Sequence, residues 1–184
     1  MNPKTYLDLK DFVIKSGFIN DIIYYEDGGT PAPDAKDFAL ETIFVICNSG
    51  MRAQTARKIF NRVKIRLVCN REIGDAYKHP GKVAAIRKIW DHQKWYFLHY
   101  TACMTDLERL CFFETIPFIG KITKYHLAKN LGIDVVKPDR HLVRIAKTYN
   151  TDPETLCKNL SEATGDKVSV VDYVIWRAAN LRKI

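Results

Sequence analysis

Asp139 has the residue type and the setting that most clearly suggest chemistry in this chain. It follows Lys137-Pro138 and precedes the run Arg140–Ile145, whose apolar residues recur at helical spacing. This pattern predicts that Asp139 lies at the first turn of a helix, where the helix dipole favours an ionised carboxylate. An ionised carboxylate can stabilise a developing positive charge or prepare a water molecule to attack. Taken alone, however, an Asp after a Pro is more often only a helix cap.

A second feature lies upstream, where a tight turn is followed by a helix. Pro117 fixes the backbone of the turn, and Gly120 permits close approach of another molecule. The start of the helix presents unpaired backbone N–H groups to an anion, and Lys121 and Lys124 add positive charge. These properties predict phosphate binding. A Pro-x-x-Gly turn between helices is common, so the turn alone does not indicate a function. It becomes informative because Asp139 follows Gly120 by nineteen residues.

Together, the turn and the segment Lys137–Ile145 resemble the helix-hairpin-helix DNA glycosylases, the superfamily that includes endonuclease III, MutY and AlkA. The similarity covers roughly residues 35–148 and is strong over 116–145. It implies that Asp139 is the catalytic residue and that the substrate is a damaged or mispaired base flipped out of double-stranded DNA. A carboxylate suits this reaction because positive charge builds on the deoxyribose as the base departs. His141 would support the loop that carries the aspartate.

The resemblance places the hairpin at about residues 105–131. It also implies a structural monovalent cation there, held by the backbone carbonyls of Glu114, Ile116 and Ile119. No other cofactor is expected. The four-cysteine iron–sulfur cluster of endonuclease III and MutY has no counterpart, since the chain contains no CxxC pair.

Two positions depart from the family pattern. Phe118 stands where Gly is typical, and a bulky residue restricts positive φ, so the first bend of the hairpin is expected to differ. Ile122 stands where strand-cleaving members carry the lysine that forms a Schiff base with the sugar. The sequence therefore predicts base removal without strand cleavage, and a displaced lysine is the alternative.

Base flipping requires residues that fill the hole in the DNA and others that hold the extruded base. The resemblance assigns these tasks to the loop of residues 48–52, to the turn of residues 90–94 and to nearby aromatic residues. The individual candidates are Asn48, Met51, Trp90, His92 and Trp95, with His126 one turn beyond Ile122 on the same helix face. Aromatic residues at helical spacing more often belong to a core, so only one or two are assigned to the pocket.

The elements that position these residues are predicted to be helices. Apolar residues recur at three- and four-residue spacing, and strand alternation is hard to find. Cap signals predict helix starts at Thr105-Asp106, His79-Pro80 and Asp152-Pro153. We predict an all-α, two-lobed fold with a helix-hairpin-helix motif and a DNA-binding cleft between the lobes. The lobes are expected to comprise about residues 35–130, and 1–34 plus 131–184.

Length and composition agree with one folded unit. The chain has 184 residues, a formal net charge of +8 and a pI near 9.2, which favours a polyanionic partner. Five scattered cysteines predict buried thiols in a reducing compartment rather than disulfides or a zinc site. The N-terminus lacks the apolar run of a signal peptide or membrane span. A cytoplasmic or nuclear monomer that binds double-stranded DNA and no membrane is therefore expected.

Three functions remain open. The first is a glycosylase acting on an oxidised or alkylated purine, since the Pro-Asp pair resembles AlkA-like members. The second is a non-catalytic helix-hairpin-helix module that binds DNA through phosphate contacts alone. The third is a helical protein-interaction domain. Excision dependent on Asp139 distinguishes the first from the second, and salt-dependent DNA binding distinguishes the second from the third.

Overall fold

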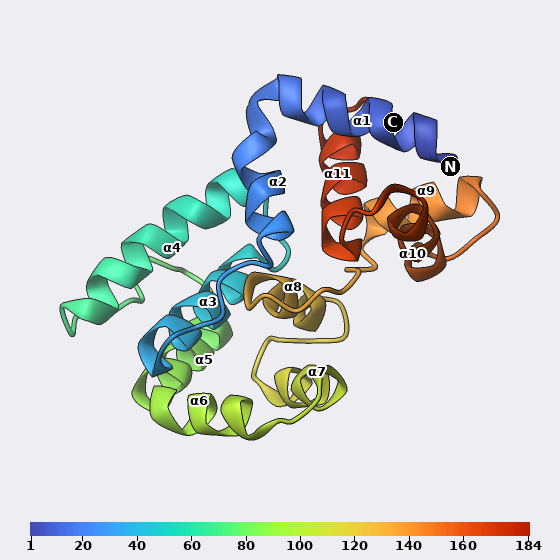
Figure 1. Cartoon of the computed structure of the whole chain (residues 1–184). Coiled ribbons are helices and arrows are strands. Elements are labelled where there is room, and N and C mark those ends of the chain that lie inside the picture. The colour runs from blue at the N-terminus through green and yellow to red at the C-terminus, as the bar shows by residue number, and fades with distance from the viewer. The chain divides into compact units, whose positions relative to one another are not determined.

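The computed structural model describes residues 1–184 as helices joined by short connections, with no strand (Figure 1). The prediction of an all-α protein is confirmed. The helices are α1 (Pro3–Val13), the π-helical turn η1 (Ile14–Phe18), α2 (Ile19–Glu26), α3 (Ala35–Asn48), α4 (Ala53–Val68), α5 (Pro80–Asp91), α6 (Gln93–Ala102), α7 (Asp106–Thr115), α8 (Thr123–Asn130), α9 (Arg140–Thr148), α10 (Pro153–Thr164) and α11 (Val168–Asn180). None of them has both the length and the apolar character that crossing a membrane requires.

The chain divides into two compact units. We call residues 31–127 the hairpin unit, because they contain the turn of the predicted hairpin. Residues 1–30 and 128–184 form the aspartate unit, which contains Asp139. The boundary falls inside α8, after Leu127.

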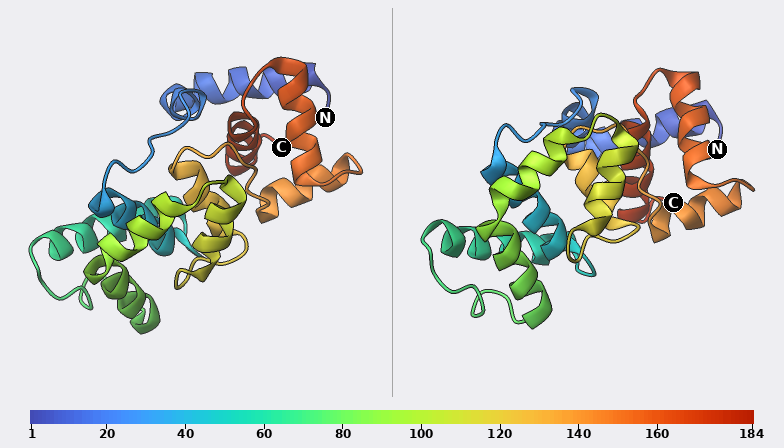
Figure 2. Two further views of the ribbon diagram at one scale, coloured as in Figure 1. Left: turned by 60° about the horizontal axis from the view of Figure 1, so that its bottom comes forward. Right: turned by 90° about the horizontal axis from the view of Figure 1, so that it is seen from below.

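α3 is the centre of the hairpin unit. It is apolar on nearly all sides, since residues 38–40 and 45–47 are all buried. α4, α5 and α6 pack around it (Figure 2). The ring of Phe38 stacks on Tyr100 of α6, with 5.0 Å between centroids, and lies 6.4 Å from the ring of Phe113 of α7. α3 therefore anchors the helices that lead into the hairpin.

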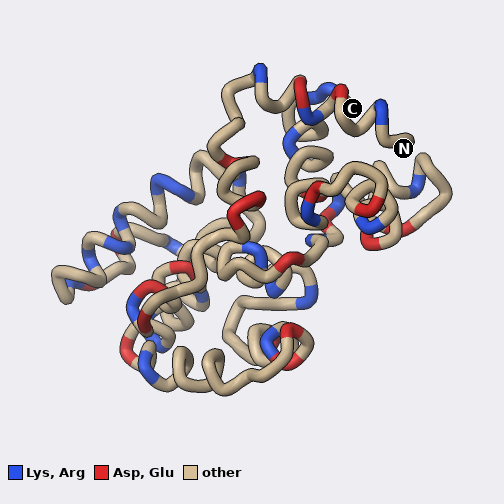
Figure 3. The backbone as a smooth tube through the Cα atoms, in the orientation of Figure 1, with Lys and Arg blue, Asp and Glu red and all other residues tan.

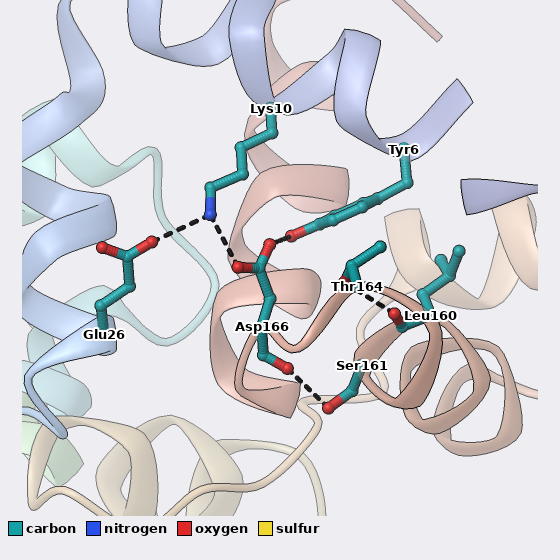
Figure 4. Close-up of polar contacts among 7 residues, drawn as sticks. All are labelled: Tyr6, Lys10, Glu26, Leu160, Ser161, Thr164 and Asp166. Carbon is teal, nitrogen blue, oxygen red and sulfur yellow. Dashed lines mark hydrogen bonds and ion pairs between the residues drawn. The ribbon is translucent and has the colours of Figure 1, made fainter. Parts of the chain in front are cut away.

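α11 has the same role in the aspartate unit. Its residues 169–175 are all buried, and α1, α2, α9 and α10 pack against it. A polar cluster joins three segments of this unit (Figure 4). The carboxylate of Asp166, just before α11, accepts a hydrogen bond from Tyr6 at 2.6 Å and pairs with Lys10 at 2.7 Å. Lys10 of α1 also pairs with Glu26, the last residue of α2, at 2.9 Å.

Local sequence signals set the helix starts, as predicted. Thr105 caps α7 in a reciprocal capping box with Glu108, and Asp152 caps α10 just before a Pro. His79 caps α5, because its Nδ1 accepts a backbone N–H from the first turn. These three predictions are confirmed. Each depends on residues within one helical turn, so tertiary packing has little influence on it.

The prediction of buried thiols is wrong for three of the five cysteines. Cys47 and Cys157 are buried, but Cys69 and Cys111 are exposed and Cys103 is half-buried. Cys69 lies just past the end of α4, and Cys111 lies on the outer side of α7. Apolar neighbours in the sequence indicate burial only for residues on the inward face of a helix. The three cysteines that are not buried lie outside such a face. All five thiols are free.

Candidate functional site

Asp139 caps the N-terminus of α9 from an extended backbone conformation. Its Oδ1 accepts the backbone N–H groups of His141 at 2.9 Å and of Leu142 at 3.1 Å. Its Oδ2 accepts no hydrogen bond from the protein. The side chain is half-buried, so the carboxylate is held in place by one oxygen and presents the other. His141 contributes through its backbone N–H.

A buried ion pair fixes the backbone just before Asp139. Asp172 of α11 accepts the backbone N–H of Lys137 at 2.5 Å and pairs with the Nζ of Lys129 at 3.1 Å. The N–H of Asp139 in turn donates to the carbonyl of Lys137 at 2.7 Å. The N–H and the carbonyl of Lys137 are therefore both hydrogen-bonded. These bonds fix the backbone that leads to Asp139.

The electrostatics of this cluster follow from its burial. Burial lowers the pKa of Lys129, but Asp172 and Tyr25 both raise it, and the pKa ends above its ordinary value. The Nζ of Lys129 also lies 4.7 Å from the ring centre of Tyr25, a further favourable contact for a cation. Burial lowers the pKa of Lys137, although Asp139 and Asp172 oppose the shift.

Sequence reasoning did not connect Lys129 with Asp172. The available signal was a single carboxylate inside the apolar run Val168–Ile175, which requires a partner if the run is buried. Nothing in the sequence indicates which cation that partner would be. α8 and α11 are distant in the chain, so only the tertiary structure identifies the pair.

In the hairpin unit, the turn between α7 and α8 has the geometry of an anion site. Gly120 donates its N–H to the hydroxyl of Thr123 at 2.7 Å. The backbone N–H groups of Lys121, Ile122 and Thr123 have no acceptor in the protein. A Cβ placed on Gly120 would meet nothing within 4 Å, so the turn is open to an approaching molecule. Its residues, 114–123, line an open hollow of about 600 Å³ together with Ser49.

The prediction about Phe118 is wrong. Phe118 has a φ of 64°, so the first bend adopts the left-handed conformation although it carries a phenylalanine. This conformation costs a bulky residue about 1–2 kcal/mol. The ring offsets part of that cost, since it lies edge-on against His79 at 5.7 Å between centroids and contacts the surface left open by Gly81. A Cβ on Gly81 would approach the Phe118 ring to 3.0 Å.

The two lysines of the turn differ in their surroundings. Lys124 pairs with Glu114 at 2.6 Å, and this hydrogen bond raises the pKa of Lys124. Lys121 is exposed and has no partner. Ile122, the residue predicted to replace a Schiff-base lysine, is also exposed. Of the carbonyls expected to hold a cation, that of Ile116 accepts the N–H of Ile119 at 2.9 Å and retains one lone pair.

The structure separates the residues predicted to contact a flipped base. Ser49, beside Asn48, lines the hollow at the hairpin, whereas Met51 lines a second hollow of about 430 Å³ with His79 and Pro80. The remaining candidates lie outside both hollows: Asn48 bonds back to its own helix, His126 packs against Phe44, Trp90 is half-buried, His92 is exposed between α5 and α6, and Trp95 is half-exposed on His99. Loop 48–52 is thus the part of the predicted set that adjoins the hairpin.

The chain resembles known proteins in its structure rather than in its sequence. No protein-family model matches the sequence, and no curated protein is significantly similar to it. A crystal structure of Methanocaldococcus jannaschii 8-oxoguanine glycosylase/lyase, in complex with a 15mer DNA containing 8-oxoguanine, matches with a TM-score of 0.71 at 18% identity. The match covers 95% of this chain and 94% of that chain. This chain has the fold of an 8-oxoguanine DNA glycosylase.

A second crystal structure of the M. jannaschii 8-oxoguanine DNA glycosylase agrees, with a TM-score of 0.72 at 17% identity over 95% of this chain and 91% of that one. The resemblance to the helix-hairpin-helix glycosylases is therefore confirmed for the fold.

The charge of the chain is distributed unevenly between the two units. The hairpin unit has 16 Lys and Arg against 9 Asp and Glu, whereas the aspartate unit has 13 against 12. Nearly all of the net charge of +8 belongs to the hairpin unit.

Proposed function

We propose that the protein is a DNA N-glycosylase, which hydrolyses the bond between a damaged or mispaired base and its deoxyribose in duplex DNA. The observation that carries this proposal is the carboxylate of Asp139, with one oxygen held by two backbone N–H groups and the other unpaired. The fold supports the same reaction class, since a protein with this fold is named as an 8-oxoguanine glycosylase.

The chemistry requires a negative charge beside the sugar. As the C1′–N bond lengthens, the base takes the bonding electron pair and the deoxyribose becomes an oxocarbenium-like cation. The Oδ2 of Asp139 can stabilise that cation and can accept a proton from the water that adds to C1′. The two backbone N–H groups at the N-terminus of α9 orient the carboxylate through Oδ1. Free base and an abasic site are the products.

DNA would be held through the hairpin. The unpaired N–H groups of residues 121–123 and the positive charge of Lys121 suit a phosphate, and the open space at Gly120 allows it to approach. Backbone carbonyls of Glu114, Ile116 and Ile119 would hold a monovalent cation that shapes this turn. Carbonyl oxygens are suitable ligands for such an ion. The high positive charge of the hairpin unit supports the same partner.

We further propose that the enzyme removes the base without cleaving the strand. The support is Ile122, which has no amine to form a Schiff base. The similar M. jannaschii protein is named as a glycosylase/lyase, so a displaced lysine is the competing possibility. For the substrate we propose a purine lesion, oxidised or alkylated. The 8-oxoguanine in the M. jannaschii complex supports the oxidised purine.

The test is excision on a panel of duplexes that each carry one lesion or mismatch, with abasic sites revealed by alkali. The wild-type protein is expected to release a purine lesion, and Asp139→Asn is expected to lose roughly a hundredfold or more of the single-turnover rate. Asn caps a helix as well as Asp does, so the stability of this variant should be unchanged. Duplex binding without excision of any lesion would instead favour the non-catalytic module.

Borohydride trapping tests the absence of strand cleavage. A monofunctional enzyme forms no imine with the sugar, so no covalent protein–DNA adduct should appear on the lesion duplex. An adduct would show that another lysine has the role, and peptide mapping would identify it. The first residues to examine would be Lys121, adjacent to Ile122, and Lys137, whose pKa is lowered by burial two residues before Asp139.

A further inference from the structure

The positive charge of the hairpin unit is concentrated on one helix that is separate from the hairpin. Between Glu41 and Glu72 the sequence contains no acidic residue, and it contains seven Lys and Arg. These cations are Arg52, Arg57, Lys58, Arg62, Lys64, Arg66 and Arg71, and five of them belong to α4. Figure 3 shows the cations at intervals along α4 with no acidic residue among them. On α1, by contrast, Lys4 and Lys10 alternate with Asp8 and Asp11.

The cations of α4 lie opposite its buried side. Ala56, Ile59, Val63 and Leu67 are the buried residues of the helix. At about 100° per residue, Lys58 and Arg62 form one row and Arg57 and Lys64 another, on either side of the exposed face. All four are exposed, and none forms an ion pair within the protein. The charge on this face is therefore uncompensated.

The remaining cation of α4 is already neutralised. Arg66 pairs with Asp75 at 3.5 Å and donates to the carbonyl of Glu72 at 2.8 Å. Arg71 is also unpaired, but it lies beyond the C-terminal end of α4. The available cations of the helix and of its N-terminal cap thus span the stretch from Arg52 to Lys64. This stretch is about 18 Å long at 1.5 Å per residue, which matches about five phosphate steps of one DNA strand.

The ring of Phe44 in α3 contacts both α4 and α8, the helix that follows the hairpin turn. Phe44 of α3 lies edge-on to His126 of α8 at 6.1 Å and to Phe60 of α4 at 5.3 Å between centroids. The guanidinium of Arg57 lies 5.5 Å from the centre of the same ring. The helices that carry the cationic face and the hairpin turn therefore pack against the same residue of α3.

We infer that α4 is a second DNA-binding surface, which holds the sugar–phosphate backbone of duplex DNA outside the base that is excised. This inference rests on the proposed function and adds a surface to it. Exposed cations on a rigid helix, with no acidic neighbour, suit phosphates and carry no sequence preference. The surface would supply binding to undamaged DNA, and the hairpin and Asp139 would act at the lesion.

The test uses two triple variants that remove the same charge. Lys58→Gln/Arg62→Gln/Lys64→Gln neutralises the exposed face of α4, and Lys36→Gln/Lys88→Gln/Lys94→Gln neutralises three exposed lysines on α3, α5 and α6. Gln is a good helix former, so both should keep the melting temperature of the wild type. Fluorescence anisotropy would give Kd for an undamaged duplex of about 30 base pairs as a function of KCl concentration.

The α4 triple variant is expected to weaken binding by roughly tenfold at low salt and to reduce the slope of log Kd against log[KCl] by about 2.7, or 0.9 for each lost phosphate contact. The control triple variant should leave the slope near that of the wild type. Equal slopes for the two variants, with the wild type still binding, would overturn the role of α4 and leave the glycosylase proposal intact. Absence of duplex binding by the wild type would overturn both. Stronger binding of the wild type to duplex RNA than to duplex DNA would also overturn the inference.

Discussion

The Nζ of Lys129 lies 3.1 Å from the Oδ2 of Asp172, and the two side chains are only 6% and 5% exposed. The same carboxylate oxygen accepts the N–H of Lys137, in the segment that leads to Asp139. A charged pair this deeply buried leaves a costly unpaired ion if either partner is removed. The pair therefore links the stability of the aspartate unit to the placement of the candidate catalytic residue.

Removing the lysine should test this link. Lys129→Met is expected to lower the free energy of unfolding by about 3–5 kcal/mol, because Asp172 would be buried without a counter-ion. The double variant Lys129→Met/Asp172→Asn should recover most of that loss, since Asn carries no charge and still accepts the N–H of Lys137. Urea unfolding at neutral pH would measure both. A loss below about 1 kcal/mol for the single variant would indicate a solvated pair.

The two lysines of the hairpin should differ in their contribution to DNA binding. Lys121→Gln is expected to reduce the salt slope of duplex binding by about one, because a free charge is removed from the proposed phosphate site. Lys124→Gln should reduce it by less, since Lys124 is already paired with Glu114 at 2.6 Å. Anisotropy titrations at several KCl concentrations would compare them. A larger effect at Lys124 would show that the pair opens when DNA binds.

Phe118 provides a test of backbone strain. At its φ of 64°, Phe118→Gly should be more stable than Phe118→Ala by about 1 kcal/mol, because both lose the ring and only Gly adopts this conformation without cost. The control is the same pair of substitutions at Cys111, which is exposed in the middle of α7, and the order of stability there should be reversed. There Gly should be less stable than Ala by about 1 kcal/mol. The same order at both positions would exclude the left-handed bend.

The thiols should divide into two reactivity classes. Burial raises the pKa of Cys47 to about 12 and also raises the pKa of Cys157 above its ordinary value. Because only the thiolate reacts, a raised pKa leaves these thiols protonated and inert at pH 8. Iodoacetamide at pH 8 should therefore modify Cys69 and Cys111 in the native protein, and Cys47 and Cys157 only after denaturation. Peptide mass spectrometry would show the order, and early labelling of Cys47 would contradict its burial.

Much of the fold could be predicted from the sequence, because it depends on local rules. A cap residue, a Pro at the first position and apolar spacing act within one or two turns, so they indicated the starts of α5, α7 and α10. The same rules placed Asp139 at a helix N-terminus. They could not distinguish a cap from a catalytic carboxylate, because the residue has the geometry of both. The unpaired Oδ2 became visible only in the structure.

The sequence by itself determined an all-helical chain with a hairpin turn, an aspartate at a helix start and an excess of positive charge. Tertiary structure decided which groups meet. It paired Lys129 with Asp172, placed Phe118 in a left-handed bend against His79 and turned the cations of α4 towards solvent. The physical reason is the range of the interactions. Capping and helical periodicity act between near neighbours, whereas ion pairing, ring packing and exposure depend on segments that only folding brings together.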